Sequence, residues 1–183
     1  IVFGLKKPVV AIAGNHDSPD RLAFGSKFFT AHGLHVFGQA GVQDGTVILE
    51  DRYDEVAICA LPYADAPFVR AALKDDGITS HEEAMAALVR RADEATAGYR
   101  RRVMVAHTFV AGGQSSDSER PLSVGGAASV PPSLFAGFQY TALGHLHRPQ
   151  RMGAAAYSGS LMKYSFDEAG HKKSVSIVEI NGN

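Results

Sequence analysis

Three short aliphatic runs in this sequence each end at a histidine-bearing segment, and this recurrence is the strongest constraint on the fold. One run precedes Gly-Asn-His-Asp at 14–17, a second precedes His107, and a third precedes Gly-His-Leu-His at 144–147. Short aliphatic runs bounded by polar residues predict buried strands. Because open α/β sheets place ligands at the carboxyl ends of their strands, we expect these three segments to meet at one edge of a sheet.

Helical and strand-like patterns alternate along the rest of the chain. Ser80 and Glu83 form a capping box ahead of apolar residues at helical spacing, and Asp65 opens another short helix. Ser18 is the expected N-cap of a helix that runs to about Phe29. Strands are expected at 9–13, 36–37, 46–49, 56–61, 103–106, 140–143, 155–158 and 175–180, the last buried on both faces. This order predicts an α/β fold with a mixed sheet.

Composition sets the outer limits of these interpretations. With 183 residues, of which 45% are hydrophobic, the chain can bury the core of one domain or most of one. Its single cysteine, Cys59, excludes an internal disulfide and is expected to be a buried, inert thiol. No apolar run approaches the roughly 18 residues of a membrane span, so we expect a cytoplasmic protein with no membrane partner. The net charge of −1 gives no electrostatic support for nucleic-acid binding.

The residue types in the three segments suit a phosphoester hydrolase that uses divalent metals. Two metals about 3.5–4 Å apart offset the repulsion between a phosphodiester and hydroxide, and they lower the pKa of a bound water. Imidazole suits manganese, iron or zinc, and the neutral amide oxygen of Asn15 adds no negative charge against the substrate. His16 is the candidate to approach the phosphate or protonate the leaving oxygen, and Asp17 beside it can fix its tautomer.

Each segment has a simpler interpretation when it is taken alone. Gly-Asn-His-Asp at 14–17 is equally compatible with a polar turn, because Gly and Asn tolerate positive φ. His107 alone is better explained as a hydrogen-bonded histidine at a strand end. The pair His145 and His147 would share one face of an extended segment, but a His-x-His pair is common by chance. Three such endings in one chain favour the metal-site interpretation.

Four blocks of sequence carry a resemblance to a known family. They are Gly-Asn-His-Asp-Ser-Pro at 14–19, Tyr-Thr-Ala-Leu-Gly-His-Leu-His-Arg-Pro-Gln at 140–150, Tyr-Ser-Gly-Ser at 157–160 and Tyr-Ser-Phe-Asp-Glu at 164–168. With these blocks the chain resembles the calcineurin-like metallophosphoesterases and, within them, the SbcD-type nuclease subunits of the bacterial SbcCD complex. The resemblance covers essentially all 183 residues in the expected order.

The resemblance implies a fold and a set of site residues. The implied fold is a mixed β-sandwich flanked by helices, here as one partial domain over 1–183 with no second domain. The implied cofactors are two divalent metal ions, Mn²⁺ above all. Asn15, His107 and His145 would hold one metal and His147 the other, with His16 as the catalytic histidine on the phosphate side.

The resemblance also implies a substrate and partners. The expected activity is exonuclease and endonuclease cleavage of DNA in end processing, repair and recombination, together with an SbcC-like ATPase. The family forms homodimers within a heterotetramer, to which the helix expected at 18–29 could contribute. A long polar loop near 112–126 favours substrate contact over a plain surface connection, with Arg120 and Arg148 as the expected phosphate contacts.

The chain departs from the family pattern at its beginning. Members open with an Asp-x-His segment and then a Gly-Asp-x-x-Asp segment, which supply further ligands and the carboxylate that bridges the metals; neither occurs here. Because the sequence begins at Ile1 without Met, we interpret it as an N-terminally truncated piece that lacks its first strands and is inactive on its own. Two alternatives stay open: a dinuclear phosphatase or cyclic-nucleotide phosphodiesterase, and a fragment that acts only in binding.

Overall fold

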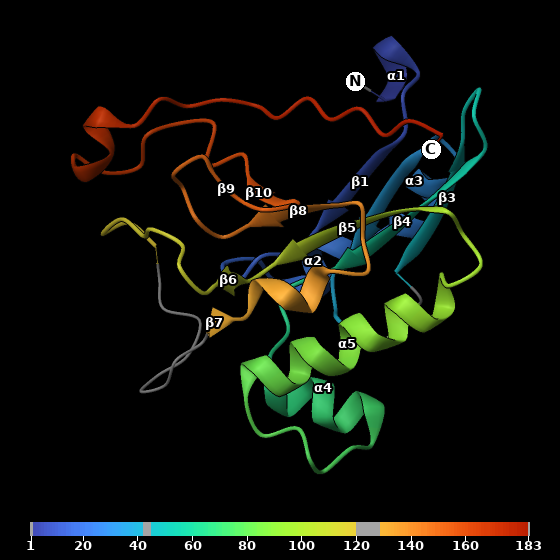
Figure 1. Ribbon diagram of the computed structural model, residues 1–183, viewed down its shortest axis with the longest axis horizontal. Helices are drawn as coiled ribbons and strands as arrows, with labels where there is room; N and C mark the ends of the chain where they lie inside the picture. Colours follow the sequence, from blue (N-terminus) through green and yellow to red (C-terminus); the bar gives the residue numbers. More distant parts are fainter. Residues whose placement is uncertain (1, 42–44, 120–128, 183) are drawn as a thin grey trace.

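A six-stranded mixed sheet forms the centre of the computed structural model, which describes residues 2–41, 45–119 and 129–182 (Figure 1). The strand order is β3-β4-β5-β8-β10-β9, in which the four central strands are parallel and the two edge strands antiparallel to their neighbours. The strands are β3 (Thr46–Glu50), β4 (Glu55–Leu61), β5 (Arg101–His107), β8 (Tyr140–Gly144), β9 (Gln150–Met152) and β10 (Ala155–Tyr157). The α/β fold with a mixed sheet is therefore confirmed.

Two helices lie on one side of this sheet. They are α4 (Ala66–Leu73) and α5 (His81–Ala95), which lie together below the sheet in Figure 1. The predicted capping box is present: Ser80 accepts from the Glu83 N–H, and the Glu83 carboxylate accepts from the Ser80 N–H. The main core lies between α5 and the sheet and includes Met85, Leu88, Cys59, Met104 and Tyr157. Cys59 is buried, as expected.

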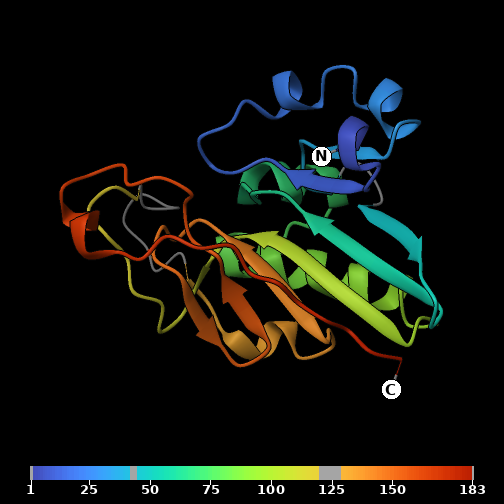
Figure 2. The same cartoon turned by 90° about the horizontal axis from the view of Figure 1, so that it is seen from above.

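A second, smaller layer lies beside the sheet. It consists of the parallel pair β1 (Val9–Ile12) and β2 (Leu34–Phe37), connected by α2 (Pro19–Ala23) and α3 (Ser26–Thr30) and preceded by α1 (Val2–Leu5). Figure 2 shows α2 and α3 on the side of this layer that faces away from the large sheet. The Tyr63 N–H donates to the Ala13 carbonyl at 2.9 Å, which joins the end of β1 to the segment just after β4.

The helix expected from Ser18 to Phe29 is two helices. Gly25 stands between them at a φ of 75°, in the left-handed region, so the backbone cannot continue as one α-helix there. Ser18 has the extended backbone of an N-cap and is followed by Pro19, but its side chain makes no capping hydrogen bond. The start of the helix was predicted correctly and its length was not.

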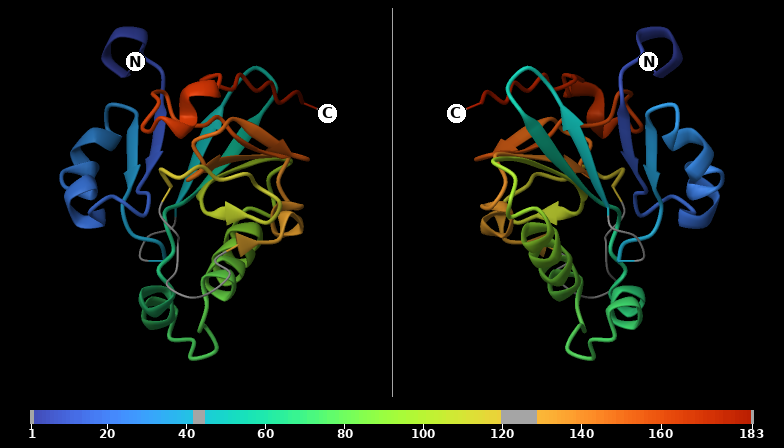
Figure 3. Two further views of the ribbon diagram at one scale, coloured as in Figure 1. Left: turned by 90° about the vertical axis from the view of Figure 1, so that its left-hand side faces the viewer. Right: turned by 90° about the vertical axis from the view of Figure 1, so that its right-hand side faces the viewer.

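The strand expected at 175–180 is absent. Residues 171–182 form an irregular, extended segment on the side of the sheet opposite α4 and α5 (Figure 3). The Ser158 hydroxyl reaches the Ser176 hydroxyl at 2.8 Å, and Arg101 reaches the Ile180 carbonyl, but no backbone ladder forms in this described segment. Ile177 is 91% exposed and Val178 41%, so the expectation of burial on both faces is also wrong.

Several short elements were not predicted from the sequence. They are α1, β9, the parallel pair β6 (Phe109–Val110) and β7 (Ser129–Val130), and the 3-10 helices η1 (Pro132–Phe135) and η2 (Asp167–Gly170). In the part of the chain that the structure describes, no helix combines the length and apolar character needed to cross a membrane.

Candidate functional site

The three histidine-bearing segments converge at one edge of the sheet. His107 is the last residue of β5 and is in register with Gly144, the last residue of β8. The Thr108 N–H donates to the Gly144 carbonyl at 3.3 Å, and the bond from Tyr63 to Ala13 brings the end of β1 to the same edge. A cavity of about 510 Å³ opens there, and its walls include five of the predicted site residues: Asn15, His16, His107, His145 and His147.

The His107 ring lies against two glycines. A Cβ atom on Gly14 would lie 2.7 Å from His107 Cε1, and one on Gly144 would lie 3.0 Å from His107 Nδ1. Neither position has room for a side chain while the ring stays in place, so these glycines let the backbones of two segments approach the imidazole closely. His107 Nε2 then reaches Asn15 Oδ1 at 2.9 Å.

Two of the predicted ligands are held in the neutral form. Burial, with a smaller contribution from the neighbouring His145, lowers the pKa of His107 to about 4, while Asp17 opposes the shift. Burial likewise lowers the pKa of His145 to about 4, against the opposing charge of Glu119. The two rings meet edge to face with centroids 5.4 Å apart. A neutral imidazole has the free lone pair that binds a metal, so both rings are ready to bind one near neutral pH.

The segment at 144–147 is not the extended strand that the His-x-His spacing suggested. His145 has a φ of 118°, which is rare for a residue with a side chain, and the chain bends there. Leu146 between the two histidines is buried in the main core, only 3% exposed. Both histidines still reach the cavity. The bend at His145 and the buried Leu146 direct them there, and not the alternation of a regular strand.

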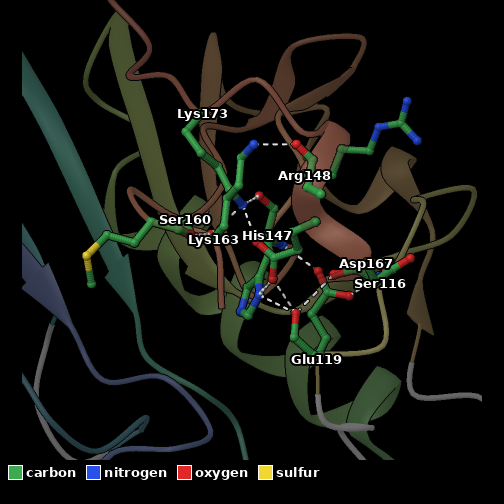
Figure 4. Close-up of polar contacts among 12 residues, drawn as sticks. Ser116, Glu119, His147, Arg148, Ser160, Lys163, Asp167 and Lys173 are labelled. Carbon is green, nitrogen blue, oxygen red and sulfur yellow. Dashed lines mark hydrogen bonds and ion pairs between the residues drawn. The ribbon is translucent and has the colours of Figure 1, made fainter. Parts of the chain in front are cut away.

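His147 is held by residues that sequence reasoning did not single out. Its Nδ1 lies 2.8 Å from both Glu168 Oε1 and Ser118 Oγ, and its backbone N–H donates to Glu119 Oε1. Figure 4 shows His147 in the middle of this network, with Lys173 and Glu119 on opposite sides. The block at 164–168 contributed to the family resemblance, and it contains Glu168, but no local spacing indicated a role for that carboxylate.

The remaining predicted residues lie in different settings. Asp17 Oδ2 accepts a hydrogen bond from the Gly14 N–H at 2.7 Å, which closes the turn at 14–17. Arg148 donates to Gln114 Oε1 at 2.6 Å and is not among the residues that line the cavity. Arg120 lies outside the described residues.

The donor atoms fit a first-row divalent metal in chemical type. Two ligands at right angles with bonds of about 2.1 Å lie about 3 Å apart, which is close to the 2.9 Å between Asn15 Oδ1 and His107 Nε2. Among residues 2–41, 45–119 and 129–182, no three His, Cys, Asp or Glu side chains are arranged closely enough to hold a metal by themselves. His107 Nε2 donates a hydrogen bond to Asn15 Oδ1, and loss of that proton would leave the two atoms at the spacing of neighbouring ligands of one metal.

Comparison with known proteins gives two informative relatives, whereas no protein-family model matches the chain. Both are named as the SbcD component of the nuclease SbcCD. The Bacillus subtilis protein is 40% identical over 187 aligned positions, which cover 95% of this chain, and the Staphylococcus epidermidis protein is 33% identical over 181 positions, which cover 98%. The chain spans about half the length of these relatives, 47% of each. The similarity confirms the resemblance that the sequence motifs indicated, and the chain is a homologue of the SbcD-type nuclease subunits over the part of those proteins that it spans.

Proposed function

We propose that this chain carries the histidine-rich part of the active site of a metal-dependent nuclease that hydrolyses phosphodiester bonds in DNA. The observation that carries the proposal is the convergence of Asn15, His107 and His145 on one cavity, with Asn15 and His107 in direct contact. The names of the two relatives support a nuclease over other hydrolases that use similar ligands.

The proposed roles follow from the donor atoms. Asn15, His107 and His145 would hold one Mn²⁺ ion and His147 the other. When bound, the metals supply a water of lowered pKa and offset the negative charge of the phosphodiester. His16 lines the same cavity and would protonate the leaving oxygen or contact the phosphate. Asp17 holds the turn that places His16 and Asn15, because its carboxylate accepts the Gly14 N–H.

The proposed partners are DNA, an SbcC-like ATPase and a second copy of the protein. The relatives are named as one component of SbcCD, and this name supports the ATPase partner. Phe24 and Phe28 are 85% and 81% exposed around α2 and α3, which supports a homodimer contact there within a heterotetramer. The process would be DNA end processing, repair and recombination in the cytoplasm, with Arg148 and Arg120 contacting phosphates.

The test is cleavage of linear duplex DNA in Mn²⁺ by the protein produced from its complete reading frame, with and without the ATPase. We expect cleavage by the wild type and by the control His32→Ala, because His32 does not line the cavity. His16→Ala and His107→Ala should cleave DNA at least about 100-fold more slowly. A small diester such as bis(p-nitrophenyl) phosphate is assayed in parallel.

Two results would contradict the nuclease proposal. Hydrolysis of the small diester without any DNA cleavage, even with the ATPase present, would indicate a phosphatase or cyclic-nucleotide phosphodiesterase. Binding of DNA or ATPase without Mn²⁺ binding or turnover by the complete protein would indicate a binding role only.

A further inference from the structure

A fully buried carboxylate lies behind His147. Glu168, on η2, has 0% exposure, and its oxygens accept hydrogen bonds from three side chains: Lys173, Ser118 and His147. Lys173 is also paired with it as a salt bridge, in which the lysine side chain is 12% exposed. Replacing a buried ion pair by apolar residues of similar volume is often neutral or even stabilising. The presence of a charged network here therefore calls for a role other than stability.

The network determines which nitrogen of His147 carries the proton. Nδ1 lies 2.8 Å from Glu168 Oε1, and an ionised carboxylate only accepts hydrogen bonds, so Nδ1 must be the donor. The Ser118 hydroxyl already donates to the same carboxylate oxygen. If Nδ1 were unprotonated, two lone pairs would face each other at that distance. Nδ1 therefore carries a proton, and the neutral ring is the Nδ1–H tautomer with its lone pair on Nε2.

Lys173 keeps this arrangement charged and fixed in place. The ammonium group forms an ion pair with Glu168 Oε2, while Ser118 and His147 donate to Oε1, so both oxygens of the buried carboxylate have partners. The ammonium group also donates to the His147 carbonyl at 3.0 Å and to Ser160 Oγ at 2.7 Å. One lysine thus contacts both the carboxylate that binds the His147 ring and the backbone that carries it.

We propose that Glu168 and Lys173 are positioning residues for His147: they fix its Nδ1–H tautomer and ring orientation, so that Nε2 is presented to the cavity as a metal-binding nitrogen. Metal-ligating histidines commonly donate their second N–H to a carboxylate, which fixes the tautomer and raises ligand basicity. The metal-binding half of this inference rests on the function proposed above, whereas the tautomer itself does not.

The first test needs no metal and no variant of the network. Long-range ¹H–¹⁵N spectra of the complete, metal-free protein, labelled with ¹⁵N-histidine, distinguish the two tautomers, and the His147 signals are assigned by their loss in His147→Ala. The proposal expects a protonated Nδ1 and an unprotonated Nε2 in the wild type. An unprotonated Nδ1 overturns it.

The second test removes the charge pair without leaving a buried, unpaired charge. The double variant Glu168→Leu with Lys173→Met replaces both groups by apolar side chains of similar size. We expect His147 to lose its fixed tautomer and Mn²⁺ affinity to fall about 10- to 100-fold, as for other partners of metal ligands. The control is Lys172→Met with Glu179→Gln, two exposed residues, which should change neither the tautomer nor the Mn²⁺ affinity.

The outcomes separate this inference from the proposed function. A folded double variant that keeps the Nδ1–H tautomer and full Mn²⁺ affinity overturns the positioning role. If the double variant does not fold, the tautomer of the wild type still decides the matter. The wild type could show the expected tautomer while His147→Ala leaves the Mn²⁺ affinity unchanged. This result would contradict the ligand role of His147 and still support its fixation by Glu168.

Discussion

Asn15 Oδ1 lies 2.9 Å from His107 Nε2, although 92 positions separate the two residues in the chain. Asn15 follows β1 in the small layer, and His107 ends β5 in the large sheet. Near this contact, the Tyr63 N–H donates to the Ala13 carbonyl and joins the two layers. The candidate site therefore lies where the two layers meet.

The first prediction concerns the loss of the Asn15 side chain, one member of this pair. Asn15→Ala deletes the amide oxygen. Mutation of residues that only hydrogen-bond to a metal ligand already lowers metal affinity about 10- to 100-fold, so we expect Mn²⁺ affinity to fall at least that much. Nuclease activity should fall with it. Isothermal titration with Mn²⁺ measures the effect, and Asn181→Ala, an exposed asparagine, is the control. An unchanged Mn²⁺ isotherm in Asn15→Ala would remove Asn15 from the ligand set.

The second prediction concerns the space around the His107 ring. A Cβ atom introduced by Gly14→Ala would lie 2.7 Å from His107 Cε1, closer than unbonded carbons approach, so the His107 ring or the Gly14 backbone must shift. We expect a loss of stability of about 1–3 kcal/mol, typical of overpacking, and weaker Mn²⁺ binding. Thermal unfolding and Mn²⁺ titration measure the two effects.

Gly98→Ala is the control for this substitution, because a Cβ atom there has no neighbour within 4 Å. If Gly14→Ala bound Mn²⁺ as the wild type does, the close approach of Gly14 to His107 would not be needed by the site.

Local patterns were sufficient to predict most of the fold. The capping box at Ser80 and Glu83 needs only residues three apart, and the central strands needed only short aliphatic runs. Strand ends also brought the histidines to one edge, because parallel neighbours share their carboxyl ends. The pairing of Asn15 with a particular histidine came from the family resemblance and not from any local pattern.

The failures have physical causes as well. A β-branched segment becomes a strand only if a backbone partner is available, and residues 175–180 contact the sheet through side chains instead. A glycine within a helical pattern is ambiguous, and Gly25 at a φ of 75° ends a helix that the pattern would have continued. Ser118 and Glu168 are 50 positions apart, so their joint contact with His147 had no signal in local spacing.

The third prediction concerns His81, for which the sequence indicated no role. Its Nδ1 lies 2.9 Å from the Ala64 carbonyl and its Nε2 2.8 Å from the Thr108 hydroxyl, next to His107. Burial lowers the pKa of His81 below its usual 6.5, against opposing effects of the Ala64 hydrogen bond and Asp65. The folded state therefore binds fewer protons than the unfolded state once the pH falls below about 6.5.

The stability contributed by neutral His81 is then fully present above pH 6.5 and is lost as the pH falls through the folded pKa. In His81→Gln we expect lower stability at pH 7.5 and a smaller further loss between pH 7.5 and 5 than in the wild type. Urea unfolding in chelator at both pH values measures this. His32→Gln is the exposed control, and an equal pH dependence in wild type and His81→Gln would contradict the prediction.

The fourth prediction concerns the residue that supports the chain just after His107. The Tyr157 hydroxyl donates to the Thr108 carbonyl at 2.8 Å and accepts from the Val110 N–H at 2.9 Å, and the side chain is 1% exposed. Tyr157→Phe keeps the ring but leaves two backbone groups without this partner. Since an unsatisfied buried polar group costs about 1–3 kcal/mol, we expect a loss of stability of that order in urea unfolding. Tyr99→Phe, outside the main core, should be near neutral, and equal unfolding midpoints for the two variants would show that Thr108 and Val110 find other partners.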